Sequence, residues 1–289
     1  MKSLSISIAG FILKLQSDDS IELSLDDGYL PYIIPESPKK PDIIIHCKTP
    51  VPAELCNAED IIFEARNSEK RFYCICKLFD SYKFIIYDQE KEGVIRQIAI
   101  LNADFSEWTV YSCGHNNDKV FPLHFPMGPI ILYYLTVKYD AIMIHASGVV
   151  DPLGGRIFMG FSGSGKSTMA AIWQFRGSTI INDDRLIIRK ENSNYVMYNT
   201  PMFYPDKPKK AVLKQVHIIH HSPENNMVRI SGARAVSKVL AFCIQNDFNA
   251  GFIEHHLAFL SEMCSKIPVY EVGFKSDPEI VDYIQQHAV

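Results

Sequence analysis

Residues Gly160–Thr168 read Gly-Phe-Ser-Gly-Ser-Gly-Lys-Ser-Thr, which matches the pattern G-x-x-x-x-G-K-[ST] of a phosphate-binding loop. Glycines at positions 160, 163 and 165 allow tight turns that point backbone N–H groups at a phosphate chain. The pattern assigns Lys166 to the outer phosphates and the Ser167 hydroxyl to a divalent metal. The nucleotide-binding positions expected from this stretch are Gly160, Ser162, Gly163, Ser164, Gly165, Lys166, Ser167 and Thr168.

The segments on either side of the loop have the character that the motif requires. Arg156–Met159 is short and largely apolar, as a buried strand is, and Met169–Phe175 suits a helix with Gly177 as its C-cap. The positive N-terminal end of that helix adds to an anion site. The alternative, a glycine-rich turn with an incidental lysine, is disfavoured by this order of strand, loop and helix.

The composition sets the class of protein. The 289 residues are 47% hydrophobic and 21% charged, which predicts a packed core in one large or two modest domains. A net charge of −4 with no long basic run argues against a dedicated nucleic-acid or membrane-surface protein. Seven cysteines without framework spacing indicate reduced thiols and a cytoplasmic location. No apolar run is long enough to predict a membrane span.

The chain divides into two parts of different character. Residues 1–125 are β-rich, with period-two patterns, and are expected to form an N-terminal domain of unknown role. Residues 126–289 are expected to form an α/β nucleotide-binding domain that opens with an apolar helix from Met127. Expected strands cover 3–9, 71–77, 82–87, 95–101, 141–150, 156–159, 179–189, 212–219 and 268–274, and expected helices cover 127–138, 169–175, 231–245, 254–266 and 278–287.

The segment before the loop predicts a hairpin. Ala141–Val150 is apolar enough for a strand, and Asp151–Gly155 carries strong turn signals. The chain then returns as the strand that feeds the glycine loop. Because a hairpin makes an antiparallel pair, we expect a mixed sheet.

An acidic pair follows the next predicted strand. Asp183 and Asp184 could divide two tasks of phosphoryl transfer, in which one carboxylate binds Mg²⁺ and the other accepts the proton of an attacking hydroxyl. The alternative is an exposed turn with local hydrogen bonds. Position behind a phosphate-binding loop favours the functional interpretation.

Other polar residues near the motif have two interpretations each. His145 lies in an apolar strand and is either a core residue or a member of the reaction centre. Arg185 either stabilises transferred phosphoryl charge or pairs with an acid. Two clusters are poor metal sites: His217 and His220 would face opposite sides of a strand, and Cys74-x-Cys76 lacks a second pair of ligands.

The combination of three features resembles a known superfamily. The strand containing His145, the Gly160–Ser167 loop and the sequence Asn182-Asp-Asp-Arg185 are similar to the core of HPr serine kinase/phosphorylase proteins. They are also similar to the nucleotide core of ATP-dependent phosphoenolpyruvate carboxykinase. The resemblance covers about residues 125–289 and implies a carboxykinase-like P-loop core with a mixed sheet.

The resemblance also implies roles for individual residues. Lys166 and Ser167 become the phosphate and metal residues, Asp183 the general base, Asp184 a metal-side carboxylate, and His145 a residue at the edge of the reaction centre. The chain lacks the Glu-x-Arg-Gly-like segment of HPr kinases, so the acceptor is not identified. It is also shorter than the carboxykinases, which disfavours a decarboxylating enzyme.

The leading hypothesis is an ATP- and Mg²⁺-dependent kinase that phosphorylates a hydroxyl, such as a serine of a protein, peptide or small molecule. A nucleotide-binding or sensing protein with little catalysis is the alternative. No nucleic-acid or membrane partner is expected, and the nucleotide preference, phosphorolysis and oligomeric state stay open.

Overall fold

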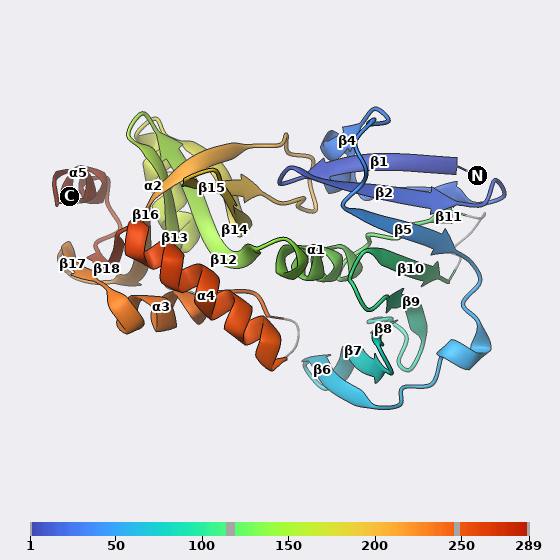
Figure 1. Ribbon diagram of the computed structural model, residues 1–289. Helices are drawn as coiled ribbons and strands as arrows, with labels where there is room; N and C mark the ends of the chain where they lie inside the picture. The colour runs from blue at the N-terminus through green and yellow to red at the C-terminus, as the bar shows by residue number, and fades with distance from the viewer. Residues whose placement is uncertain (1, 114–118, 246–248, 288–289) are drawn as a thin grey trace. The chain divides into compact units, whose positions relative to one another are not determined.

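The computed structural model describes residues 2–113, 119–245 and 249–287 (Figure 1). It is a mixed α/β chain with several sheets and a strand-rich N-terminal part. The chain forms two compact units. The first unit holds the residues up to Lys138 together with Pro201–Lys207, and the second begins at Tyr139.

The first unit is built on a nine-stranded sheet in the order β4-β1-β2-β5-β10-β9-β8-β7-β6. Strands β3 and β11 form a separate two-stranded sheet. The strands expected from alternating patterns are all present here. The bounds are β1 Lys2–Ile8, β2 Phe11–Ser17, β3 Glu22–Leu23, β4 Ile33–Ile34, β5 Ile43–Lys48, β6 Ile61–Asn67, β7 Lys70–Leu78, β8 Ser81–Tyr87, β9 Ile95–Leu101, β10 Glu107–Ser112 and β11 Lys119–Val120, with 3₁₀ turns at Asp27–Tyr32 and Ala53–Leu55.

Helix α1 (Met127–Lys138) spans the residues predicted for it and clusters with the first unit. It is apolar on every side, and nine of its twelve residues are buried, as is expected of a helix without a polar face. The Tyr134 ring lies 5.2 Å from Phe84 and 5.8 Å from Trp108, centroid to centroid. These aromatic contacts attach the helix to β8 and β10.

The second unit contains a seven-stranded sheet in the order β13-β12-β14-β15-β16-β18-β17. A further pairing, between β13 and β16, closes five of these strands into a ring. The β13–β16 and β16–β18 pairs are parallel and the others antiparallel, so the predicted mixed sheet is confirmed. The bounds are β12 Ala141–Asp151, β13 Gly154–Met159, β14 Thr179–Glu191, β15 Asn194–Asn199, β16 Lys210–His221, β17 Asn226–Ile230 and β18 Val269–Phe274.

The predicted hairpin before the glycine loop is also confirmed. β12 and β13 pair antiparallel from Ser147 opposite Phe158 to Asp151 opposite Gly154. The buried guanidinium of Arg156 lies 2.8 Å from the buried Asp151 carboxylate and 4.7 Å above the Trp173 ring. The hairpin is therefore fixed by a buried ion pair as well as by its ladder.

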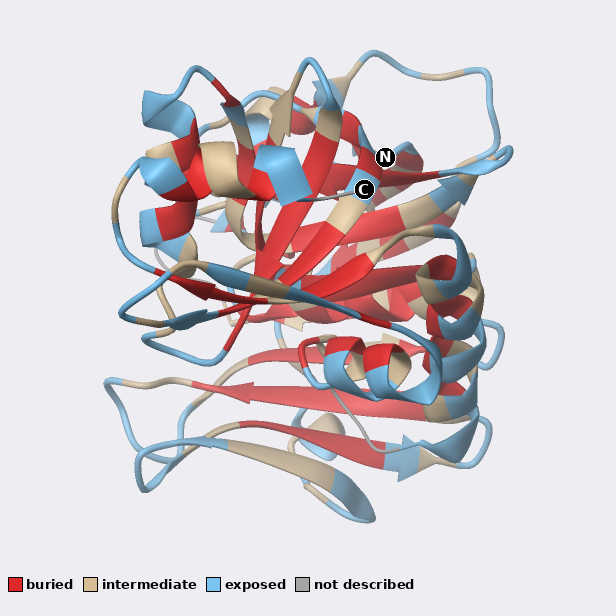
Figure 2. Ribbon diagram, turned by 90° about the vertical axis from the view of Figure 1, so that its left-hand side faces the viewer, coloured by how far each residue is buried: buried red, intermediate tan, exposed pale blue. Residues whose placement is uncertain are grey.

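Four helices belong to the second unit, and each has both buried and exposed residues; helical turns coloured both red and pale blue are visible in Figure 2. The helix after the loop begins three residues earlier than predicted, and the helix predicted to reach residue 245 ends at Leu240. The bounds are α2 Lys166–Phe175, α3 Gly232–Leu240, α4 Ala250–Lys266 and α5 Glu279–His287. No helix in the described ranges is long and apolar enough to cross a bilayer, and all seven cysteines are free thiols.

Candidate functional site

The glycine loop connects β13 to α2, which is the strand–loop–helix order expected from the sequence. Two glycines are needed for its conformation. A Cβ at position 160 would lie 2.2 Å from Ser164 Oγ, and one at 165 would lie 2.6 Å from the Phe274 ring, with φ of +90° at Gly165. Larger residues would force the loop apart at both positions.

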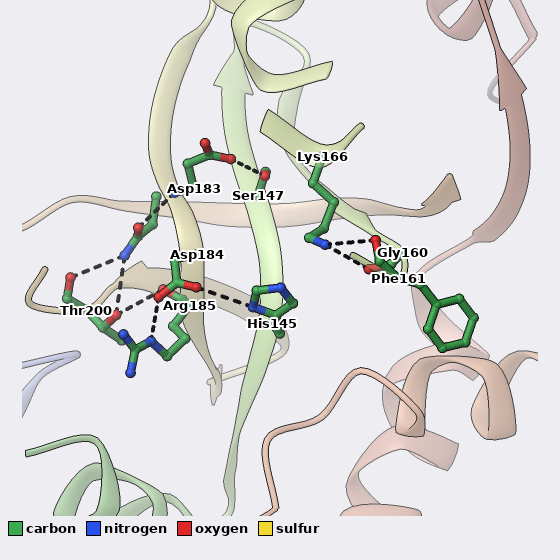
Figure 3. Close-up of polar contacts among 10 residues, drawn as sticks. His145, Ser147, Gly160, Phe161, Lys166, Asp183, Asp184, Arg185 and Thr200 are labelled. Atoms are coloured by element: carbon green, nitrogen blue, oxygen red, sulfur yellow. Dashed lines mark hydrogen bonds and ion pairs between the residues drawn. The ribbon is translucent and has the colours of Figure 1, made fainter. Parts of the chain in front are cut away.

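The Lys166 side chain folds back over the loop (Figure 3). Its Nζ donates hydrogen bonds to the carbonyl oxygens of Gly160 at 2.8 Å and Phe161 at 3.3 Å. Burial lowers the Lys166 pKa, whereas the negative charges of Asp183 and Asp184 raise it. The net effect is a Lys166 pKa below its ordinary value, because burial is the larger cause.

Strand register explains why the acidic pair meets the loop. β12 lies between β13 and β14, and Ser147 pairs with both Phe158 and Asp183. The loop begins two residues beyond Phe158, so its start is level with His145 on the antiparallel β12. His145 is in turn opposite Arg185. The order of three neighbouring strands thus brings together residues that lie up to 40 positions apart.

Asp183 is held by its neighbours on two sides. The Ser147 hydroxyl donates to Asp183 Oδ1, and the Asp183 backbone N–H donates to Asn182 Oδ1 at 2.7 Å. Ser147 is fully buried. A buried hydroxyl that donates to a carboxylate fixes the orientation of that carboxylate.

Asp184 lies between two basic side chains. His145 Nδ1 is 3.3 Å from Asp184 Oδ1, and Arg185 Nε donates to Oδ2 at 2.7 Å. The hydrogen bond with His145 is the main reason that the Asp184 pKa is lowered, with Arg185 contributing and burial opposing it. Of the two interpretations of Arg185, the structure places the residue in an ion pair with its neighbour.

The acidic pair is anchored from the other side by β15 and the residue after it. Asn182 Nδ2 donates to the Thr200 carbonyl oxygen at 3.2 Å and to its hydroxyl at 3.3 Å. Thr200 Oγ1 donates to the Arg185 carbonyl oxygen at 3.1 Å. Asn182 and Thr200 are both buried. β14 runs unbroken through the acidic pair, and this cross-strand connection ties it to the end of β15.

The remaining loop positions are open to solvent. Ser162, Gly163, Ser167 and Thr168 are exposed, and Phe161 is 75% exposed with its ring against Phe242. Ser164 Oγ is buried without a hydrogen-bond partner among the described residues. The exposed hydroxyls of Ser162, Ser167 and Thr168, together with Lys166, are donors of the kind that suits a phosphate chain.

The donor set for a metal is small. The described residues contain no cluster of three or more His, Cys, Asp or Glu side chains that could hold a metal ion. Mg²⁺ bound with nucleotides takes only one or two protein carboxylates, the rest of its shell being water and phosphate oxygens. Ser167 and Asp184 therefore fit Mg²⁺ carried by a nucleotide better than a metal held by protein alone.

Comparison with known proteins adds little to this geometry. No protein-family model matches the chain, and no curated protein matches it. Among solved structures it is similar to the HPr(Ser) kinase/phosphatase from Coxiella burnetii, with 11% identity, 50% of this chain and 95% of that chain covered, and a TM-score of 0.33. A likeness of this degree carries no information on activity.

The structure adds residues that the sequence did not single out. Ser147 lies in an apolar strand and Thr200 directly after one, and only strand pairing relates these hydroxyl residues to the acidic pair. His221 lies beside the loop, since a Cβ at Gly165 would come within 2.9 Å of its ring. His217, by contrast, is buried between Phe158 and Tyr270, and burial lowers its pKa to about 3. His220, which was predicted to face the side of the strand opposite to His217, is exposed to solvent.

Proposed function

We propose that this protein is a kinase that transfers the γ-phosphoryl group of ATP to a hydroxyl group, with the site in the second unit. The supporting observation is the strand register: Asp183 lies opposite Ser147, which in turn lies opposite Phe158, two residues before the glycine loop. Phosphoryl transfer needs a phosphate clamp, a metal holder and a group that orients the acceptor. Lys166 is a candidate for the phosphate clamp, Asp184 for the metal holder and Asp183 for the group that orients the acceptor.

Asp183 is the proposed general base. It is a carboxylate held in place by Ser147 and by the backbone, and an acceptor hydroxyl must give up a proton as phosphorus–oxygen bond formation proceeds. Lys166 is the proposed clamp for the outer phosphates, together with the N–H groups of the loop. His145 and Arg185 act through Asp184, whose position they fix.

Ser167 and Asp184 are the proposed Mg²⁺ residues. When bound, Mg²⁺ would neutralise phosphate charge and so favour departure of the leaving oxygen. The lowered pKa of Asp184 keeps its carboxylate ionised, as a cation ligand must be. The same feature makes Asp184 the weaker base of the pair.

The proposal includes a fold family and a location. A β-hairpin feeding the loop and an acidic pair on the neighbouring strand are the features on which we assign a carboxykinase-like P-loop core of the HPr-kinase-related type to this unit. Free cysteines are typical of the reducing cytoplasm, which is the location we propose. The acceptor is a hydroxyl compound, with serine as the first candidate.

The test is transfer of labelled γ-phosphate from Mg·ATP to a library of serine-containing peptides, to whole-cell protein and to water. The wild-type protein should label an acceptor or release phosphate, and Lys166→Ala should not. ATP binding by calorimetry without transfer to any acceptor would refute the kinase and favour a nucleotide sensor. Failure to bind Mg·ATP would refute both.

A further inference from the structure

The first unit contains a cavity of about 510 Å³ that the proposed kinase chemistry does not use. It lies at the ends of β8, β9 and β10. Its volume is within the range of small-molecule sites, about 300–1,000 Å³. The lining residues that carry the argument are Asp26, Asp88, Arg96, Gln97, Phe121 and His124.

A β-bulge turns two successive residues of β9 toward this cavity. Ile86 pairs with Gln97, but Tyr87 pairs with Ile95, so Arg96 is the extra residue. In a regular strand Arg96 and Gln97 would point to opposite faces. Both line the same cavity. Bulges re-aim side chains in this way beside functional sites.

Gln97 presents a buried acceptor that has no partner. The residue is 2% exposed. Its Nε2 donates to Ser112 Oγ at 3.2 Å and to the Phe121 carbonyl oxygen at 2.8 Å, which fixes the orientation of the amide. Its Oε1 has no hydrogen-bond partner in the described part of the chain. This oxygen is buried away from the cavity, so the role of Gln97 is to hold Ser112 and Phe121 in the cavity wall.

The guanidinium of Arg96 is a cationic group in the same cavity wall. Its Nη2 donates to the Phe125 carbonyl oxygen, whereas its Nε is buried and has no partner among the described residues. None of those residues places a carboxylate within 4 Å of the guanidinium. Asp26 instead binds His124 Nδ1 at 2.9 Å, and Asp88 accepts two backbone N–H groups. A half-buried guanidinium without an ion pair favours an anionic ligand.

The charges on the cavity wall indicate which class of ligand the cavity suits. Three acidic side chains, Asp26, Asp88 and Glu90, and three basic ones, Lys91, Arg96 and Lys119, line it. A wall with equal numbers of both signs suits a ligand that itself carries both charges. Arg96 shares this wall with Asp26 and Asp88, so the anionic and cationic groups of the ligand must be close together.

We propose that this cavity binds a free α-amino acid. The carboxylate meets Arg96, and the ammonium group meets the carboxylates of Asp26 and Asp88, which line the same cavity. This binding site is independent of the proposed kinase site, because none of its residues belongs to the loop or the acidic pair.

The test uses the full chain without ATP and each of the twenty standard L-amino acids at roughly 10 mM, which saturates sites with a Kd of about 1 mM or tighter. Binding is followed by saturation-transfer NMR and by the unfolding temperature. At least one amino acid should bind. The 2-hydroxy acid and the methyl ester with the same side chain should bind at least about tenfold more weakly, since each lacks one of the two charges.

Two variants locate the site. Arg96→Met should weaken amino-acid binding at least about tenfold, and so should Asp26→Asn, which keeps the shape of the side chain. The control is Arg66→Met, an exposed arginine on β6 that does not line the cavity; it should bind as the wild type does. If Arg96→Met fails to fold, Asp26→Asn decides.

Absence of binding by all twenty amino acids would overturn the proposal, as would equal binding by both variants and the wild type. Lys166→Ala should leave amino-acid binding unchanged. If the protein binds an amino acid but transfers no phosphate, the amino-acid site stands and the kinase proposal is refuted. If it transfers phosphate but binds no amino acid, the kinase proposal stands and the amino-acid site is refuted.

Discussion

Replacement of Asp183 by asparagine separates chemistry from structure at the proposed site. The amide oxygen of asparagine can still accept the Ser147 hydroxyl, and the Asp183 backbone bond to Asn182 is unaffected. The substitution converts one charge-assisted hydrogen bond into a neutral one, at a cost in stability of about 1 kcal/mol. Loss of a general base costs a factor of about 10²–10⁴ in rate, which is roughly 3–5 kcal/mol in the barrier.

The chemical effect of Asp183→Asn is thus several times its structural effect, and separate assays resolve them. Phosphate transfer is measured in single turnovers from labelled ATP, ATP affinity by calorimetry, and stability by urea unfolding. We expect transfer to fall by about 10²–10⁴ while the ATP Kd stays within about threefold. Transfer within a factor of about three of the wild-type rate would refute Asp183 as base and make His145 the next candidate.

Other substitutions probe the same site and its support. Lys166→Ala should weaken Mg·ATP binding about tenfold or more in calorimetry, because a charged contact of roughly 1–3 kcal/mol is lost; unchanged affinity in a folded variant would contradict the loop assignment. Asp184→Asn should slow transfer in a way that high Mg²⁺ partly restores, whereas equal rescue of Asp183→Asn would mean that both residues serve the metal. The Asp184 pKa lies below its ordinary value of 3.8, chiefly because of the hydrogen bond with His145. The ionised Asp184 therefore stabilises the fold fully above about pH 5, and this stabilisation is lost as the pH falls through the folded-state pKa. The unfolding free energy of the wild type should fall more between about pH 5 and pH 3 than that of Asp184→Asn; equal pH dependence of the two proteins would argue against the Asp184–His145 pair. Arg156→Met leaves the buried Asp151 carboxylate unpaired and should cost about 3–5 kcal/mol in urea unfolding, with Asp151→Asn in the same chain recovering part of the loss.

Local features of this fold could be predicted from the sequence, and distant pairings could not. The glycine loop, the Asp151–Gly155 turn and the period-two strands depend on neighbouring residues, so their signals lie within a few positions. The β13–β16 pairing joins Arg156 to Gln215, residues 59 positions apart, and no short pattern encodes such a choice of partner.

In the candidate site, too, some residues could be predicted from local sequence and others only from strand pairing. Its charged members could be predicted because the glycine-loop pattern itself contains Lys166 and directs attention to the acidic pair that follows. Ser147 could not, since a serine in an apolar strand gives no sign of what lies opposite it until the β12–β14 register is known. The bulge at Arg96 was also beyond the sequence, because Ile95–Leu101 has the composition of a regular strand.

The ring closure of the second unit has a consequence for how the loop behaves. β13 is hydrogen-bonded on both sides, to β12 and to β16, so the strand that delivers the loop has no free edge. Local opening of such a strand requires two ladders to break together, and its amide hydrogens should exchange with solvent only on global unfolding. Because the strand that leads into the loop is already ordered, a ligand that binds the loop loses less free energy to ordering the chain. More of the energy of its contacts then appears as affinity.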